Sequence, residues 1–570
     1  MEISAEAQAR AGRLSRSASR VMSRVIQERC GEGDGPRIVL DVRQGIGSGA
    51  YHVSDSPGGV CVAGGDGRGL IYGVGKLLRD GRFEPGRFAA GPWRGRSVPQ
   101  KPVRGMYFAT HFHNFYHDAP VAEVVRYVEE LALWGCSTLA VWFDMHHFQG
   151  IGDPEAVAML ERLRAILRAG EEVGIGASLV CLSNEGYDSS PVELRADWTA
   201  GHDGYTSPPG GHYHREVCPS KPGGMDYILR VRREMFDAFA DLDVRHVWVW
   251  PYDQGGCTCT RCTPWGANGF LRCAEPVARL AHETWPAARV ILSTWYFDHF
   301  IAGEWEGLYE RLRRGPLPGV DMLLADDFGG FPEYPLQHGA PGGLSMVGFP
   351  EISMERMFPW GGFGANPRPA HWQADWDKVG RLLSGGFPYS EGIFEDINKA
   401  VMLQFYWGGR TALDTVREYA AYEFSPAVAE DVTRAIGGME SAMNHGVTSA
   451  FRNYAGARAS GGKAGPAPPI YKVGGDPNAY ARLIEAADRR LPAYARRGWR
   501  WRVLYVRAAL DKELHESGGR PTARSEELFA ELVRIYAARG ADYAVVPPSC
   551  RSLSRFHGPW LMDLVDGAGA

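Results

Sequence analysis

The sequence lacks any long apolar run. No stretch of its 570 residues approaches the roughly 18 continuous apolar residues of a membrane-spanning helix. The first 29 residues are polar and rich in Ala and Arg, without the apolar segment that a secretory signal needs. We therefore expect a cytoplasmic protein with no membrane partner, an expectation that a signal trimmed from the sequence would change.

An excess of charge of one sign is missing as well. The formal net charge is −5, and Lys and Arg are scattered along the chain. This pattern excludes the basic patch typical of proteins that bind nucleic acid or anionic membranes. The hydrophobic share of 45% is ordinary for a globular protein with a sizeable core. A homodimer is left open.

Cysteine is scarce, with 10 residues in the chain, which excludes a disulfide scaffold. One cluster stands out: Cys257, Cys259 and Cys262, with Cys273 further on. Thiols at such short spacing predict a structural zinc site, although the spacing is not that of a standard zinc knuckle. The alternatives are reduced thiols or, in an exported protein, a disulfide clip. The cluster follows Asp253 closely and is expected to shape the loop that carries it.

The first hundred residues read as a small α/β domain. The composition predicts a helix over 1–27 and strands over 37–42 and 59–63. A glycine-rich turn then leads into an apolar, helix-spaced run over 67–78. This segment lacks the glycine and lysine pattern of a phosphate-binding loop, so we expect its glycines to serve close packing.

From Val103 onward, short apolar runs alternate with amphipathic helices, for example over 121–134, 154–173 and 225–240. Such alternation predicts a parallel sheet. Eight runs within about 290 residues fit a closed (β/α)₈ barrel, which typically takes about 250. The runs are 105–108, 138–142, 177–181, 246–250, 289–293, 321–325, 344–348 and 386–389.

After residue 398 the chain is predicted to be helical. A segment rich in Gly, Ala and Pro, residues 455–476, reads as a loop or linker. The predicted organisation is an N-terminal α/β domain over 1–100, the barrel over 101–405 and a helical domain over 406–570. The helices are expected over 414–424, 426–443, 480–493, 499–515 and 523–539.

The residues that follow the predicted strands are rich in carboxylates, histidines and aromatics. In such barrels the active site lies at the carboxyl ends of the strands. Cleavage of a glycosidic bond needs one carboxylic acid and a second carboxylate, and crowding of carboxylates lets one keep its proton near neutral pH. We expect Asp253 to be the acid and Asp327 or Glu351 the base or nucleophile, with Glu185 and Glu391 in reserve. The expected sugar-binding residues are His111, His113, Asp144, Tyr252, Trp295, Tyr296 and Trp360.

Several of these residues also have a structural interpretation. Asp326 could cap the next helix and leave Asp327 for chemistry. Glu395, Asp396 and Lys399 could form a solvated or capping group. Trp142 and Trp250 could be core residues, and His146 and His147 could bond backbone. Catalysis by carboxylates requires no cofactor.

Segments in three parts of the chain resemble known glycoside hydrolases. Arg68-Gly69-Leu70-Ile71-Tyr72-Gly73-Val74 resembles the small α/β domain that precedes the barrel in β-N-acetylhexosaminidases and α-glucuronidases. Arg104-Gly105-Met106, with the helix ending at 131–135, resembles the first unit of those barrels. The stretches 419–424 and 502–510 resemble the helical domain of the α-glucuronidases. The resemblance implies this three-part architecture and glycoside hydrolysis.

The chain departs from both families after the fourth strand. Hexosaminidases carry an Asp-Glu pair there, but this chain has Asp253-Gln254, and glutamine cannot donate the proton. The α-glucuronidase pattern, aligned by strand order, implies Asp253 as acid, one methylene shorter than the usual Glu, with Asp327 and Glu351 as candidate bases.

The predicted function is hydrolysis of a terminal sugar from an oligosaccharide or glycoside. One alternative is a metal-dependent hydrolase, suggested by His111-Phe112-His113, although the bridging lysine of that class is missing after strand four. Another is an inactive sugar-binding barrel, suggested by Gln254.

Overall fold

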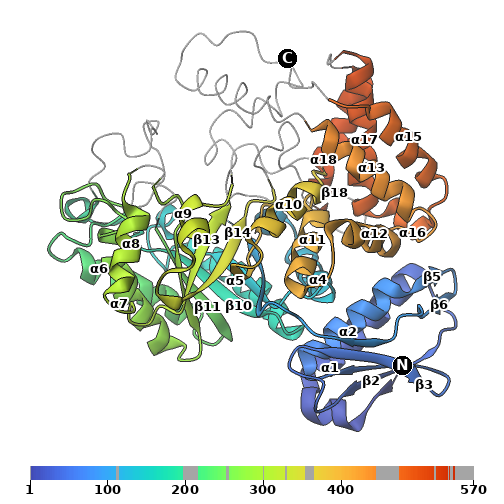
Figure 1. Ribbon diagram of the computed structural model, residues 1–570, viewed down its shortest axis with the longest axis horizontal. Coiled ribbons are helices and arrows are strands. Elements are labelled where there is room, and N and C mark those ends of the chain that lie inside the picture. The colour runs from blue at the N-terminus through green and yellow to red at the C-terminus, as the bar shows by residue number, and fades with distance from the viewer. Residues whose placement is uncertain are drawn as a thin grey trace.

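The computed structural model has three parts that follow one another along the chain (Figure 1). An N-terminal α/β part, in blue, lies beside the first helices of a barrel, and a bundle of helices, in orange and red, ends the described chain. The residues that the structure describes are 2–110, 115–196, 216–251, 256–298, 301–327, 330–353, 365–443, 474–518, 522–536, 538–539 and 544–545.

The N-terminal part is a mixed five-stranded sheet, in the order β1-β2-β4-β3-β7, with helices α1 and α2 packed on it. Glycine lets α2 approach its neighbours closely, as the sequence predicts: a Cβ on Gly75 would lie 2.1 Å from the carbonyl oxygen of Leu133. The elements are β1 (Glu2–Ile3), α1 (Ala5–Cys30), β2 (Arg37–Val42), β3 (Tyr51–Ser56), β4 (Gly59–Gly64), α2 (Gly67–Asp80), β5 (Arg82–Glu84), β6 (Arg87–Ala89) and β7 (Gly95–Ser97).

The middle part is a closed barrel of parallel strands, which confirms the predicted (β/α)₈ fold. Each strand pairs in parallel with the next, and the last, in two segments, pairs with the first. The strands are β8 (Val103–Phe108), β9 (Thr138–Trp142), β10 (Gly176–Leu182), β11 (Val244–Trp250), β12 (Arg289–Ser293), β13 (Met322–Asp327), β14 (Ser345–Pro350), and β15 (Leu383–Gly386) with β16 (Tyr389–Ser390). Their carboxyl ends therefore form one rim.

Helices follow the strands along the barrel. They are α3 (Phe115–Asp118), α4 (Val121–Leu133), α5 (Pro154–Glu172), α6 (Gly224–Ala238), α7 (Gly269–Thr284), α8 (Glu304–Arg313), α9 (Glu333–His338), α10 (Pro369–Val379) and α11 (Asp396–Trp407). Every residue of α11 is buried, because this helix lies between the barrel and the C-terminal helices.

Aromatic side chains fill the upper half of the barrel. The ring of Trp248 stacks on Tyr107 at 5.8 Å and on Trp250 at 6.0 Å, and Phe349 packs edge-on against Trp250 at 5.1 Å. These residues alternate along their strands with outward-facing ones, as period-two geometry requires. The barrel is thus a packed core whose top layer, which includes Trp250, is the floor beneath the rim.

The C-terminal part is helical, and its helices lie within a few residues of the predicted bounds. None of the helices formed by the described residues is both long and apolar enough to cross a membrane. The helices are α12 (Ala412–Glu423), α13 (Ala429–Ala442), α15 (Pro477–Asp488), α16 (Ala493–Arg497), α17 (Trp499–Glu516) and α18 (Ala523–Tyr536), followed by a short pair, β17 (Ala538–Arg539) and β18 (Ala544–Val545).

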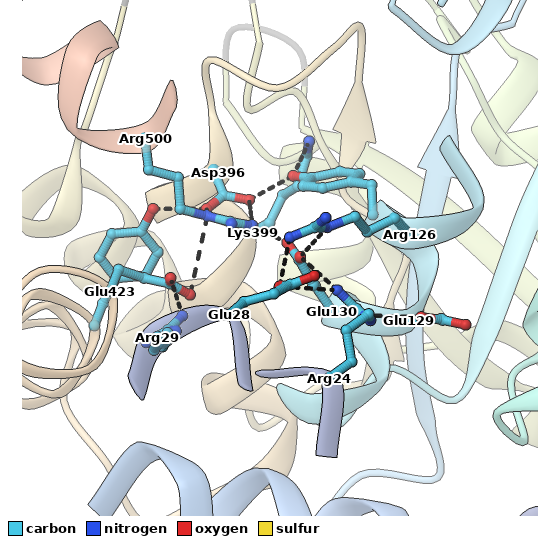
Figure 2. Close-up of polar contacts among 12 residues, drawn as sticks. Arg24, Glu28, Arg29, Arg126, Glu129, Glu130, Asp396, Lys399, Glu423 and Arg500 are labelled. Atoms are coloured by element: carbon cyan, nitrogen blue, oxygen red, sulfur yellow. Dashed lines mark hydrogen bonds and ion pairs between the residues drawn. The ribbon is translucent and has the colours of Figure 1, made fainter. Parts of the chain in front are cut away.

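An ion-pair network joins the three parts where α1, α4, α11, α12 and α17 meet (Figure 2). Arg500 of α17 contacts Glu130 at 2.8 Å and Asp396 at 2.6 Å, and Arg29 of α1 contacts Glu423 at 2.8 Å. Charged groups line a cavity of about 530 Å³ at this junction.

Candidate active site

The candidate site is the rim formed by the residues just after the barrel strands. Its described parts follow β9, β10, β12, β13, β14 and β16. Five predicted site residues lie outside the described residues, and the structure neither supports nor opposes them: His111, His113, Tyr252, Asp253 and Trp360.

Glu185 follows β10 and is fully buried. Its carboxyl group contacts Nδ1 of His146 at 2.5 Å and accepts hydrogen bonds from the His146 amide at 3.2 Å and from Nε1 of Trp142 at 3.3 Å. Arg232 of α6 donates to its backbone carbonyl at 3.1 Å. This carboxylate is therefore fixed by Trp142 of β9 and by His146 in the loop after β9. The imidazole ring of His146 bonds a side chain, where the structural interpretation expected backbone.

Asp144 and His147 form a second polar pair after β9. Nε2 of His147 lies 3.1 Å from the Asp144 carboxylate. Burial raises the pKa of Asp144 to about 7, with nearby Glu185 adding to the rise and His146 opposing it. Both members of the pair line a cavity of about 640 Å³ beside the rim.

Glu351 and Glu391 lie at the ends of neighbouring strands, β14 and β16. Glu351 is the register partner of Tyr389, whose hydroxyl donates to the Glu391 carboxyl group at 2.6 Å. Ser353 connects the two: its amide donates to Glu351 at 2.8 Å, and its hydroxyl accepts from the Glu391 amide at 2.9 Å. The sequence placed these glutamates in separate roles, and the fold brings them together.

The electrostatics around Glu391 favour its protonated form. Burial raises the pKa of Glu391 to about 8, and the negative charges of Glu351 and Glu395 add to the rise, against the hydrogen bond from Tyr389. Glu391 therefore holds a proton at neutral pH, which a general acid requires.

Glu395 is connected to Glu351 and Glu391 through two serine hydroxyls. One of its carboxylate oxygens accepts from the hydroxyls of Ser353 at 2.9 Å and Ser390 at 2.6 Å, and Lys399 lies 3.7 Å away. Burial lowers the pKa of Lys399 to about 8. The interpretation of Glu395, Asp396 and Lys399 as a solvated or capping group is wrong, since all three are buried and no side chain caps α11.

The strand register distinguishes Asp326 from Asp327. Register partners in parallel strands point to the same face, and Asp326 is the partner of Phe349, which packs inside the barrel. Asp327 is the partner of Pro350 and lines a small cavity on the outer face with Tyr406. The register therefore favours Asp326 over the predicted Asp327 for a site above the barrel.

Trp295 and Tyr296 follow β12. Trp295 is buried and stacks on Trp250 at 5.3 Å, which extends the aromatic floor. Tyr296 has a backbone φ of 57°, a conformation that non-glycine residues rarely adopt. Its ring lies 4.5 Å from that of Trp295. Strain of this kind is often found at functional sites, where the surrounding structure holds it in place.

The cysteine cluster differs from the predicted set in one member. Cys257, Cys259 and Cys262 converge with Cys218, and the four thiol sulfurs lie within 4.8 Å of one another. Cys273 is buried on α7 and is not one of these four. Cys218 is 39 residues from Cys257 in the sequence, so no local spacing could have identified it.

The fold has counterparts among solved structures. A family GH115 4-O-methyl-α-glucuronidase with specificity for decorated arabinogalactans aligns with a TM-score of 0.58 and 11% identity, over 97% of this chain and 79% of its own. A GH138 enzyme targeting pectin rhamnogalacturonan II aligns with a TM-score of 0.55 and 10% identity, over 97% of this chain and 73% of its own. A family 20 β-N-acetylglucosaminidase aligns with a TM-score of 0.51 and 14% identity, over 74% of this chain and 90% of its own.

This chain has the fold of these glycoside hydrolases. At such low identity the likeness establishes the architecture alone. No protein-family model matches the chain, and no curated protein matches it.

Proposed function

We propose that the protein is a glycoside hydrolase that removes a terminal sugar from an oligosaccharide or glycoside. The observation that carries the proposal is the pair of buried carboxyl groups at the rim, Glu351 and Glu391, of which Glu391 has its pKa raised to about 8. Cleavage of a glycosidic bond needs one protonated and one ionised carboxyl group on opposite sides of the bond.

In this mechanism Glu391 is the acid. It donates its proton to the glycosidic oxygen as the bond from that oxygen to the anomeric carbon breaks. Glu351 is the second carboxylate, acting on water or on the anomeric carbon itself. The aromatic layer of Trp250 and Trp295 supplies the apolar floor that the C–H face of a sugar ring requires.

This assignment replaces Asp253 by one of the reserve residues of the sequence prediction. It also leaves Glu185, held by His146, as a carboxylate that contacts substrate or positions the rim. Asp253 and Gln254 stay hypotheses, since they lie outside the described residues.

The activity test is a panel of nitrophenyl glycosides, beginning with α-glucuronides and β-N-acetylglucosaminides, the substrates that the similar structures suggest. Glu391→Gln keeps the shape of the side chain and removes its proton. We expect it to lower kcat/KM by about 10²–10⁴-fold on a substrate with a poor leaving group, and less on an activated aryl glycoside.

The pH profile adds a second readout. Wild-type kcat/KM is expected to fall as the pH rises through about 8, because Glu391 then loses its proton. This limb should vanish in Glu391→Gln. The matched control is Asp327→Asn, a carboxylate on the outer face of the barrel, which should retain wild-type activity.

Wild-type turnover by Glu391→Gln on both kinds of substrate would remove Glu391 from the mechanism. Absence of hydrolysis across the panel, with sugar binding retained in calorimetry, would favour the inactive sugar-binding barrel instead. Loss of activity on metal removal with no change in Tm would favour the metal-dependent hydrolase.

A further inference from the structure

We propose that Cys218, Cys257, Cys259 and Cys262 bind one structural zinc ion, which ties the loop after β10 to the loop after β11. The sequence pattern indicated three of these cysteines with Cys273 as the fourth, whereas in the fold the fourth cysteine of the group is Cys218. The fold supplies Cys218, and its four-sulfur set is a donor set typical of structural zinc.

The distances between the sulfur atoms fit a tetrahedral metal site. Sγ of Cys218 lies 3.9 Å from Sγ of Cys259 and 3.9 Å from Sγ of Cys262. A tetrahedron with Zn–S bonds of about 2.3 Å has S–S edges of roughly 3.8 Å. A disulfide would need about 2.05 Å. The thiols are therefore spaced as ligands around one ion and not as a disulfide clip.

The surroundings suit a charged thiolate centre. Cys218, Cys257 and Cys262 are buried, and Cys259 is partly exposed at the edge. The hydroxyl of Ser220 lies 3.2 Å from the sulfur of Cys262 and accepts a hydrogen bond from Arg272 at 2.9 Å. A zinc ion with four thiolates carries a net charge of −2, which this guanidinium partly offsets.

Local backbone bonds shape the ligand loop. The amide of Cys262 donates to the carbonyl of Cys259 at 2.9 Å, and the amide of Cys218 donates to the carbonyl of Leu194 at 2.8 Å. Zinc sites in which all four ligands come from the protein are structural, because no position remains open for water or substrate. The proposed ion thus takes no direct part in hydrolysis.

The site connects directly to the rim. Val217 and Gly256 each precede a ligand by one residue, and both bond to Asn184. The Asn184 side-chain amide donates to their carbonyl oxygens at 3.2 Å and 3.0 Å, and its Oδ1 accepts from the Gly256 amide at 3.2 Å. Asn184 immediately precedes Glu185. The ion therefore holds in place the two loops that bond Asn184, the residue before Glu185.

The first test is the metal content of the full chain, purified without metal-affinity resin or chelator. Elemental analysis should find about one zinc per chain, and X-ray absorption should show sulfur ligands at about 2.3 Å. Substitution with cobalt(II) should give the intense visible absorption of a tetrahedral thiolate site. None of these readouts depends on glycosidase activity.

Matched variants distinguish the observed ligand set from the sequence-based one. Cys218→Ser should reduce zinc to well below one per chain and lower Tm, whereas Cys273→Ser, also buried but outside the group, should keep the full zinc content. If Cys218→Ser does not fold, Cys259→Ser, at the partly exposed edge, takes its place. The zinc-free wild type should also be cleaved faster by protease near residues 256–262.

Three outcomes would overturn the proposal. They are a folded wild type that contains no metal after growth in zinc-supplemented medium, a disulfide among the four cysteines by mass spectrometry, or loss of zinc in Cys273→Ser with retention in Cys218→Ser. Failure of the glycosidase assay would leave this test unaffected, because zinc content is measured separately.

Discussion

Individual buried carboxyl groups determine how the rim responds to pH. Asp144 and Glu391 both have raised pKa values, and burial is the largest cause in each case. A buried carboxyl group whose pKa is raised is more stable protonated, so the folded protein keeps its proton at pH values where the unfolded chain has lost it. These residues reduce the stability of the fold at neutral and higher pH, a cost often found where a site serves chemistry.

Asp144 gives a prediction about stability. Its pKa rises from 3.8 in its ordinary state to about 7 in the fold. The contribution of Asp144 to the stability of the fold is therefore highest at pH values below its pKa in the unfolded chain. This contribution is lost as the pH rises from about 4 to 7. The full shift corresponds to about 4 kcal/mol of the free energy of unfolding. Asp144→Asn should raise Tm at pH 8 and leave it nearly unchanged at pH 4.

Differential scanning calorimetry at both pH values measures this effect. The control is Asp55→Asn, an exposed strand-end carboxylate, which should shift Tm equally at the two pH values. If the Tm of Asp144→Asn depends on pH as strongly as the Tm of the wild type, the pKa of Asp144 is not raised.

At the scale of residues, the sequence indicated which kinds of side chain lie at the rim but not which of them contact one another. Glu351 and Glu391 were candidates because they follow apolar strands, but their proximity depends on the isolated bridge between Glu351 and Tyr389, which no local pattern shows. The sequence favours Asp327 and the register favours Asp326, because strand register cannot be read from one strand alone. Glu395 and Lys399 read as surface charges, since nothing local shows that α11 is covered.

At the scale of the elements, closure of the barrel depends on glycine where β15 meets β8. Gly385 has a φ of +115°, and a Cβ there would lie 1.7 Å from the carbonyl oxygen of Val103. Neither the backbone conformation nor the space admits a side chain. The sequence did predict the strands well, because each apolar run is short and bounded by polar residues. It did not predict that the last strand divides into β15 and β16.

Gly385→Ala is expected to destabilise the barrel by on the order of 4 kcal/mol or to yield no soluble protein, because closure must open to admit the methyl group. Gly437→Ala on α13 is the matched control: nothing lies within 4 Å of its added Cβ. Replacing an exposed helical glycine with alanine should stabilise by up to about 1 kcal/mol. Chemical denaturation measures both, and equal stability of the two variants would refute the closure argument.

At the scale of the whole molecule, the buried ion-pair network couples the three parts. Arg500 from the C-terminal helices bonds Asp396 on the last barrel helix and Glu130 on the first long one (Figure 2). Burial alone would raise the pKa of Asp396, but the Arg500 guanidinium outweighs it and holds the pKa below its usual range. The hydroxyls of Tyr127 and Tyr419 each donate to the same carboxylate at 2.6 Å.

Removal of Arg500 should therefore loosen the junction between the parts. Arg500→Met keeps much of the side-chain volume and leaves the buried Asp396 without its guanidinium partner, which typically costs about 3–5 kcal/mol. Glu130 loses one cation but keeps its ion pairs with Arg24 and Arg126. The control on the same helix is Arg502→Met: its ion pair with Glu531 is about one quarter exposed on both sides and is worth about 0–1 kcal/mol. Because the uncompensated group is a carboxylate, lowering the pH from 7 to 5 should recover part of the stability of Arg500→Met and none in Arg502→Met. Urea denaturation followed by tryptophan fluorescence, at both pH values, measures the difference, and similar losses in the two variants would show that the network does not hold the three parts together.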